Sequence, residues 1–284
     1  NSSGKSTCIH ALAALAQTVK LPNSGRPLIL DDEYAQVHLG RFIEVIHSKS
    51  YTDLIGIGFE SSTPRSLRLL KSTTKSSHNS PFSADFKFKS TKRTQDTYLE
   101  SAIYSSSAGL LEFNLTKKTS RFEVKFNETK VNVEANYTSS LTTQLLPLQV
   151  EGDKDDAFEA FIYNESCRQF IASELSGVLY LGPFRQSPLR RYPTRGSSPT
   201  EVGAQGENSI TMLANEYVQT KNRDHLKQIS SWLQDMGLAK SVEVSRVGNS
   251  DLFDVSVTLP DGANLPIADL GYGMSQVLPV LAQC

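Results

Sequence analysis

The sequence predicts an α/β fold, in which helices pack against β-structure. Three observations lead to this prediction: a Gly-Lys-Ser sequence that opens an apolar helix near the N-terminus, a β-rich middle in which apolar and polar residues alternate, and a C-terminal part in which helical and strand patterns follow one another. At 284 residues, the chain has room for one large or two ordinary domains.

Composition narrows the class of protein. Hydrophobic residues make up 38% and charged residues 21% of the chain, which suits a globular protein with a sizeable core. The formal net charge of −1 gives no bulk attraction for nucleic acid or acidic membranes. No run of about 18 apolar residues occurs, so we expect no membrane span. Cys8, Cys167 and Cys284 lie far apart without a pairing pattern, so we expect a reducing, cytoplasmic location.

The first seven residues have the pattern of the second half of a phosphate-binding loop, G-x-x-x-x-G-K-[ST]. Gly4 has no Cβ to obstruct a backbone that curls around a phosphate, and Lys5 brings positive charge to the β- and γ-phosphates. The Ser6 hydroxyl is the candidate metal ligand, for Mg²⁺. The candidate phosphate-binding residues are Asn1, Ser2, Ser3, Gly4, Lys5, Ser6 and Thr7.

A helix is predicted to follow this loop directly. From Lys5 to about Val19 the chain is rich in Ala and Leu at helical spacing, and no Gly or Pro interrupts it before Pro22. Such a helix directs its positive N-terminal end at the bound anion. The alternative is a flexible Ser/Gly-rich terminus that contains Gly-Lys-Ser by chance, and the position of the helix start argues against it.

The middle of the chain has strand patterns on both sides of a polar segment. The sequence from Leu54 to Glu60 alternates apolar residues with Gly and predicts a strand. Residues 61–95 are rich in Ser, Thr, Lys and Arg, so we expect a loop or mobile excursion. This positively charged segment is either a surface for a polyanion or a solvated insertion, and the lack of interleaved aromatic residues favours the insertion. Residues 97–149 alternate with period two and predict an antiparallel meander.

The second half begins with helical spacing at residues 157–175. The short apolar run Val178–Leu181 then predicts a buried strand that delivers the loop Gly182–Arg185. Two helices are expected between Glu207 and Leu238, with Gly237 close to the end of the second. Residues 241–247 and 252–259 alternate around Gly248-Asn249-Ser250 and predict a hairpin.

The last segment contains a second anion-binding layout. Gly271, Gly273 and Ser275 stand at the entry to an apolar helix, and flexible glycines, a hydroxyl and a helix N-terminus together suit a phosphate. A plain tight turn that leads into a helix would give the same pattern. The presence of a phosphate-binding loop on the same chain favours the anion-binding interpretation.

Three patches resemble one family. NSSGKST at residues 1–7, VLYLGPFR at residues 178–185 and DLGYGMSQVLPVLAQ at residues 269–283 closely resemble AAA-family ATPases with an ABC-type head, the relatives of RecF, SMC and the OLD nucleases. The resemblance implies an α/β P-loop NTPase fold, the ABC-ATPase-type head: a mostly parallel core sheet with an antiparallel β layer and a helical insertion. We therefore expect one truncated head over residues 1–284, with a β-rich or loop insertion at 61–150 and a helical segment at 157–238 around core strand 178–181.

In this family two heads form a head-to-tail homodimer with each ATP held between them. The resemblance implies that Lys5, Ser6 and Thr7 hold ATP and Mg²⁺, while Gly271, Gly273 and Ser275 of the other subunit touch the γ-phosphate. Gln186 or Arg185 would sense Mg²⁺ or the γ-phosphate after the strand, although Arg185 is equally well explained as a surface or linking residue. DNA or an attached effector or nuclease module is the implied partner, in repair or phage defence, without a membrane.

Hydrolysis of ATP is the expected activity of the full-length protein. The acidic pair that activates water and the switch histidine of this family follow the signature helix, beyond Cys284, so no catalytic base is identified and residues 1–284 alone are expected to be inactive. Two alternatives remain open: another P-loop enzyme, such as a GTPase or a small-molecule kinase, and a nucleotide-binding regulator that never hydrolyses its ligand.

Overall fold

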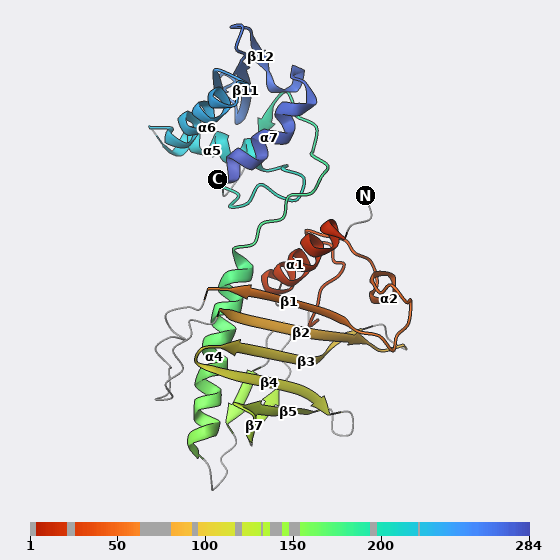
Figure 1. Ribbon diagram of the computed structural model, residues 1–284. Helices are drawn as coiled ribbons and strands as arrows, with labels where there is room; N and C mark the ends of the chain where they lie inside the picture. The colour runs from red at the N-terminus through yellow and green to blue at the C-terminus, as the bar shows by residue number, and fades with distance from the viewer. Residues whose placement is uncertain are drawn as a thin grey trace. The chain divides into compact units, whose positions relative to one another are not determined.

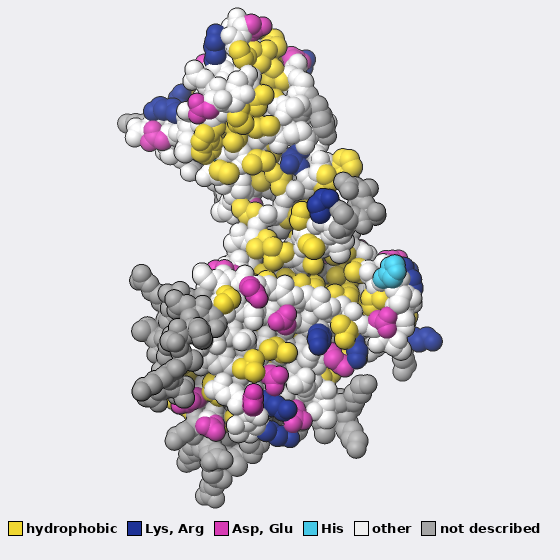
Figure 2. All heavy atoms as spheres, viewed as in Figure 1, with side chains coloured by type: hydrophobic (Ala, Val, Ile, Leu, Met, Phe, Trp, Pro, Cys, Tyr) yellow, Lys and Arg dark blue, Asp and Glu magenta, His cyan; other side chains and the backbone are white. Residues whose placement is uncertain are grey.

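The computed structural model describes residues 4–21, 26–62, 81–92, 96–116, 121–131, 133–136, 144–147, 154–193, 198–220 and 222–284. The chain divides into two compact units, Asn1–Val178 and Leu179–Cys284, and each is described by itself (Figure 1). None of the described helices combines the length and the hydropathy that crossing a membrane requires. On the face seen in Figure 2, Lys and Arg side chains lie interspersed with Asp and Glu.

Unit 1 contains a six-stranded antiparallel sheet whose strands follow chain order. The strands are β1 (Ile55–Ser61), β2 (Phe82–Ser90), β3 (Thr97–Ser106), β4 (Gly109–Thr116), β5 (Arg121–Phe126) and β6 (Thr129–Val131). The helices are α1 (Lys5–Lys20), the short α2 (Phe42–Val45) and α4 (Lys154–Ser176), and β7 (Val133–Asn136) pairs with β8 (Gln144–Pro147). Figure 1 shows α4 running across the strands of the sheet.

Alternating side chains explain why this sheet forms. In β2 every second residue is buried, including Phe82, Phe86 and Phe88, so one face of the strand is apolar. Helix α4 covers part of this face, since the rings of Phe82 and Phe170 meet edge-on at 4.9 Å between centroids. The predicted strand in 54–60 and the helix at 157–175 are confirmed. The meander predicted over 97–149 is confirmed for β3 to β6, while β7 and β8 form a separate pair and residues 117–120, 132, 137–143 and 148–149 lie outside the described ranges. The prediction of a loop over all of 61–95 is wrong at residues 82–90, and residues 63–80 and 93–95 lie outside the described ranges.

A buried glutamine fixes α1 in unit 1. The Gln17 side-chain amide donates to the carbonyl oxygens of Ile29 (2.7 Å) and Val37 (3.2 Å), and its oxygen accepts hydrogen bonds from the backbone N–H groups of Gln36 and Val37. Thr18 adds a bond from the Ile29 N–H to its hydroxyl. Buried polar groups cost free energy unless they are paired, so these bonds hold the chain after α1 in one position against the helix.

Unit 2 combines three helices with a small antiparallel sheet. Its elements are β9 (Tyr192–Pro193), α5 (Ser209–Gln219), α6 (Asp224–Asp235), β10 (Ser241–Arg246), β11 (Leu252–Thr258), β12 (Asn264–Pro266), the 3-10 turn η2 (Ile267–Asp269) and α7 (Tyr272–Gln283). The predicted pair of helices, the hairpin and the helix after the last glycines are confirmed. Gly237 follows α6 with φ 69°, a left-handed conformation that glycine adopts at little cost.

Two sequence-based expectations fail in the described part of the chain. Val178–Leu181 is not a strand, because no neighbouring strand pairs with it; the chain continues as a link in which the N–H groups of Gly182 and Gln186 donate to Ala204 and Gln205. All strand pairs in the described ranges are antiparallel, so the mostly parallel core sheet is not found there. Short turns join β3 to β4, β5 to β6 and β10 to β11, whereas parallel pairing requires long crossovers.

Candidate functional site

The first candidate element is the start of α1. Gly4 is its N-cap residue, with φ 75° and ψ −1°, and Lys5 directly after it is helical. A Cβ on Gly4 would meet no heavy atom within 4 Å, so glycine is favoured here by the left-handed backbone and not by crowding. A left-handed residue beside a right-handed one turns successive N–H groups toward one side, which makes a concave anion-binding nest.

The first turn of α1 adds no negative charge at this helix start. The first turn of α1 contains no Asp or Glu, and no side chain caps it. The first intrahelical bond runs from the Cys8 N–H to the Gly4 carbonyl (3.2 Å), so the N–H groups of Ser6 and Thr7 have no intrahelical partner. Both residues and Lys5 are exposed. The helix start therefore offers backbone donors and a positive dipole end to a solvent-borne anion. Asn1, Ser2 and Ser3 lie outside the described residues.

A groove lies beside the first turns of α1, next to the helix start. Its volume is about 630 Å³, and Thr7 and His10 of α1 line it opposite residues of β1 and of the 45–48 segment. Apolar side chains such as Leu30 and Ile55 form most of the wall, while His47 and Asp53 add polar atoms. The groove thus leaves room, next to the helix start, for a ligand larger than a phosphate. Sequence reasoning missed His10 and His47; the helical spacing of three residues from Thr7 was a signal for His10 alone.

The residues at the helix start suit a metal ion that is bound mainly by the phosphates of a ligand and by water. The Ser6 hydroxyl is the one side-chain oxygen that the motif assigns to Mg²⁺, and within the described ranges no group of three or more His, Cys, Asp or Glu side chains is placed to hold a metal. Mg²⁺ keeps several waters and takes phosphate oxygens along with one or two protein ligands. A single hydroxyl fits this kind of site.

The second candidate element is the start of α7 in unit 2. Gly271 is its N-cap residue with an extended backbone, φ −60° and ψ 157°, and Gly273 lies in the first turn. Both are exposed, neither has a positive φ, and a Cβ on either would meet no heavy atom within 4 Å. The chain's own backbone and packing therefore do not require glycine at these positions.

Ser275 and Gln186 come together in a different place. Ser275 is only 7% exposed, and it lines a cavity of about 220 Å³ together with Gln186, Tyr192 and Pro279. The two sequence-predicted residues are thus neighbours within unit 2, although 178–181 is not the strand expected to deliver Gln186. Gly271 and Gly273 are not among the residues that line this cavity.

Arg185 is engaged inside unit 2. Its guanidinium donates to the Gly182 carbonyl, its side chain lies beside Gly206, and its buried Nε makes no hydrogen bond to a described residue. These contacts give Arg185 a structural role within unit 2, and its role in sensing Mg²⁺ or the γ-phosphate stays a prediction. The α1 start belongs to unit 1 and the α7 start belongs to unit 2.

Comparisons of the chain with protein-family models, with curated proteins and with solved structures each found no match. The interpretation of both helix starts therefore depends on their residues and on the geometry described above.

Proposed function

We propose that this chain is part of a nucleotide-binding ATPase head that binds ATP with Mg²⁺ at residues Gly4–Thr7. The observation that carries the proposal is the left-handed Gly4 directly before Lys5, at the uncapped start of a 16-residue helix. A glycine nest, a lysine and a hydroxyl in this order are the parts that a phosphate-binding loop needs. In this proposal the Ser6 hydroxyl holds Mg²⁺, which supplies charge neutralisation on the phosphates.

The groove beside Thr7 supports a nucleotide over a free phosphate. At about 630 Å³ it falls within the range of about 300–1,000 Å³ that is usual for small-molecule sites. Its apolar walls with a few polar groups suit a nucleoside, whose base is flat and whose ribose carries hydroxyls. The proposal therefore assigns the phosphates to the helix start and the remainder of the ligand to this side of α1.

The proposal includes a head-to-tail homodimer in which the α7 start of one subunit completes the nucleotide site of the other. Its support is the pair of exposed glycines, Gly271 and Gly273, for which the described residues give no requirement in backbone conformation or packing. ATP hydrolysis by the full-length protein, coupling to DNA or to an effector module, and a cytoplasmic location belong to the same proposal. The absence of disulfides among Cys8, Cys167 and Cys284 is compatible with a reducing compartment.

The test is ATP binding with and without the lysine. A fluorescent ATP analogue is titrated in Mg²⁺ with the unmodified chain, with Lys5→Ala and with Lys130→Ala, an exposed lysine of β6 that removes the same charge elsewhere. We expect Lys5→Ala to weaken binding at least about tenfold, about 1.4 kcal/mol, because a charge-assisted contact with phosphate is lost. Lys130→Ala should bind normally. Equal affinity of the Lys5→Ala variant would remove the phosphate-binding assignment.

A further inference from the structure

Strand β10 forms an open edge of the sheet in unit 2. The strand order is β10-β11-β12, and β9 also pairs with β11, so among the described strands β10 has a neighbour on one side only. Its register with β11 runs without interruption from Ser241 opposite Thr258 to Arg246 opposite Phe253. An edge strand presents main-chain N–H and C=O groups that can pair with another extended chain.

Two hydrogen bonds tell which residues face that open side. The Val247 N–H donates to the Leu252 carbonyl (2.9 Å), so residue 247 points its main chain at β11. The Val242 N–H donates away from β11, to the Ser230 hydroxyl of α6 (3.0 Å). Main-chain groups alternate sides along a strand, so Val244 and Arg246 share the orientation of Val242. Ser230 occupies the main-chain hydrogen-bonding position of Val242 on this edge. The positions of Val244 and Arg246 follow it along the strand.

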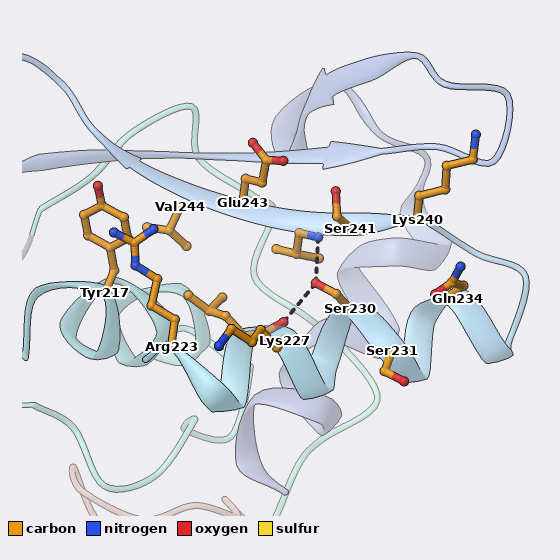
Figure 3. A pocket seen from close by; sticks show the side chains of 12 residues that line it. Tyr217, Arg223, Lys227, Ser230, Ser231, Gln234, Lys240, Ser241, Glu243 and Val244 are labelled. Atoms are coloured by element: carbon orange, nitrogen blue, oxygen red, sulfur yellow. Dashed lines mark hydrogen bonds between the residues drawn. The ribbon is translucent and has the colours of Figure 1, made fainter. Parts of the chain in front are cut away.

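A groove runs along this edge, with α6 and the end of α5 as its other wall (Figure 3). Its volume is about 570 Å³. The lining residues are Tyr217, Arg223, Leu226, Lys227, Ser230, Ser231, Gln234, Lys240, Ser241, Val242, Glu243 and Val244. Figure 3 shows Arg223 and Tyr217 at one end of the groove, Lys240 and Gln234 at the other, and Ser230 bridging α6 to β10.

The charge of the groove is predominantly positive. Arg223, Lys227 and Lys240 line it, against a single lining acid, Glu243. Lys227 also meets Asp224 at 3.3 Å, but both side chains are at least 70% exposed, so this pair is weak and exchangeable. An occupant that carries carboxylates would complement this surface.

Arg223 is held in position for such a contact. It is the N-cap residue of α6 with φ 51°, an uncommon left-handed conformation for a residue other than glycine. Its guanidinium carbon lies 3.9 Å from the centroid of the Tyr217 ring, a cation–π contact. One face of the Tyr217 ring is therefore covered by Arg223 and is not available for stacking a nucleic-acid base.

We propose that this groove binds an extended acidic peptide segment of a partner protein, which adds as a further strand beside β10. The main-chain groups of Val244 and Arg246 would pair with the peptide backbone, and Arg223 and Lys227 would contact acidic side chains at alternate positions. Strand addition obtains its affinity from main-chain bonds and its specificity from alternate side chains. The inference depends on unit 2 alone and is independent of nucleotide binding.

The direct test is binding of a labelled peptide to the full chain. The probe is a fluorescein-labelled eight-residue peptide in which Glu alternates with Val and Thr, titrated by fluorescence anisotropy at low and high salt. One control peptide carries Lys in place of Glu, and another is N-methylated on alternate backbone amides. We expect only the unmethylated acidic peptide to bind, and we expect its binding to weaken as salt screens the charges.

Variants of the groove then locate the site. Arg223→Gly removes the guanidinium at a position where glycine relieves the left-handed backbone, and Lys227→Gln removes a charge while α6 stays helical; Lys130→Gln in unit 1 is the control. We expect a loss of about two- to fivefold for each groove variant and none for the control, as for exposed ion pairs of up to about 1 kcal/mol. Amide exchange at Val244 and Arg246 should slow when the peptide binds.

The same experiments identify other occupants. Binding of the methylated peptide as tightly as the unmethylated one would rule out strand addition, and unaltered binding by both groove variants would rule out this groove. A labelled single-stranded oligonucleotide that binds in competition with the peptide and depends on Arg223 would assign the groove to nucleic acid instead. If the acidic peptide does not bind, the proposal is overturned. The positive side chains of the groove would then serve to protect the sheet edge from pairing.

Discussion

The substitution Gly273→Ala separates a role in assembly from a role in folding. Gly273 lies in the first turn of α7 without a positive φ, and the added Cβ would meet no heavy atom within 4 Å. Alanine is a better helix former than glycine by about 0.5–1 kcal/mol in a helix interior, and by less at a helix end. We therefore expect the free energy of unfolding to stay constant or to rise by up to about 1 kcal/mol.

Association should change in the opposite direction. In the proposed dimer, the nucleotide bound to one subunit lies against the backbone of Gly273 in the other subunit. A Cβ at residue 273 would then keep the nucleotide away from that backbone and weaken ATP-dependent dimerisation at least about tenfold, or about 1.4 kcal/mol. The assays are light scattering with and without ATP and Mg²⁺, and urea denaturation of the same samples. Gly177→Ala is the matched control, because it lies after α4 and its Cβ would meet carbonyl oxygens at ordinary distances of 3.5 and 3.7 Å.

Each result has a definite meaning. Loss of the dimer with stability retained supports the α7 start as part of a composite nucleotide site. If Gly273→Ala dimerises as the unmodified protein does, or if the protein stays monomeric with ATP, the assignment of the α7 start is wrong. A self-contained P-loop enzyme, such as a GTPase or a small-molecule kinase, would then explain the phosphate-binding loop better. Lower stability of Gly273→Ala would contradict the open space around this residue.

Two further predictions concern buried positions. Gly206→Ala should lower the free energy of unfolding by about 2–5 kcal/mol in urea denaturation, because Gly206 has φ 73° and an added Cβ would lie 2.7 Å from two atoms of Pro279. The control is Gly248→Ala, at φ 56° in open space, which should lose only the about 1–2 kcal/mol that the left-handed backbone costs. Equal losses in the two variants would contradict the contact between residue 206 and Pro279. Burial raises the pKa of Cys167 from 9.0 to about 12, so between these values the unfolded state loses a proton that the folded state keeps. Stability should then fall as pH rises above about 9, and Cys167 should contribute a slope of up to about 1.4 kcal/mol per pH unit. Cys167→Ala should remove this contribution, while Tyr163 and Tyr192, whose pKa values burial also raises from 10.0, keep theirs at higher pH. An unchanged slope in Cys167→Ala would assign the pH dependence to another group.

The elements that were predicted correctly are those specified by patterns of adjacent residues. The Gly-Lys-Ser sequence and the Ala-rich segment after it placed the start of α1 at the residue where the structure has it. The alternation on both sides of Gly248 predicted the β10–β11 hairpin, since period-two side chains and a turn residue are sufficient for a hairpin. The end of α6 was predicted from Gly237, because glycine readily adopts the left-handed conformation that often follows a helix.

Two elements depended on distant partners and were misjudged. β2 has the alternation Phe82, Ala84, Phe86, Phe88, but its surroundings are rich in Ser and Lys, and pairing with both β1 and β3 decides that it is a strand. The apolar run Val178–Leu181 was expected to be a strand, yet no described strand lies beside it. Composition cannot reveal whether a backbone finds a hydrogen-bonding neighbour.

The sequence by itself determined which residues stand at each helix start: a glycine, a lysine and a hydroxyl at the start of α1, and two glycines at the start of α7. These are properties of a few adjacent residues, so they hold wherever the rest of the chain lies. Only the tertiary structure decided that Ser275 is buried beside Gln186 and that the edge of β10 faces Arg223 and Lys227. Those arrangements arise from the packing of segments far apart in the chain, where burial and main-chain pairing outweigh local preference.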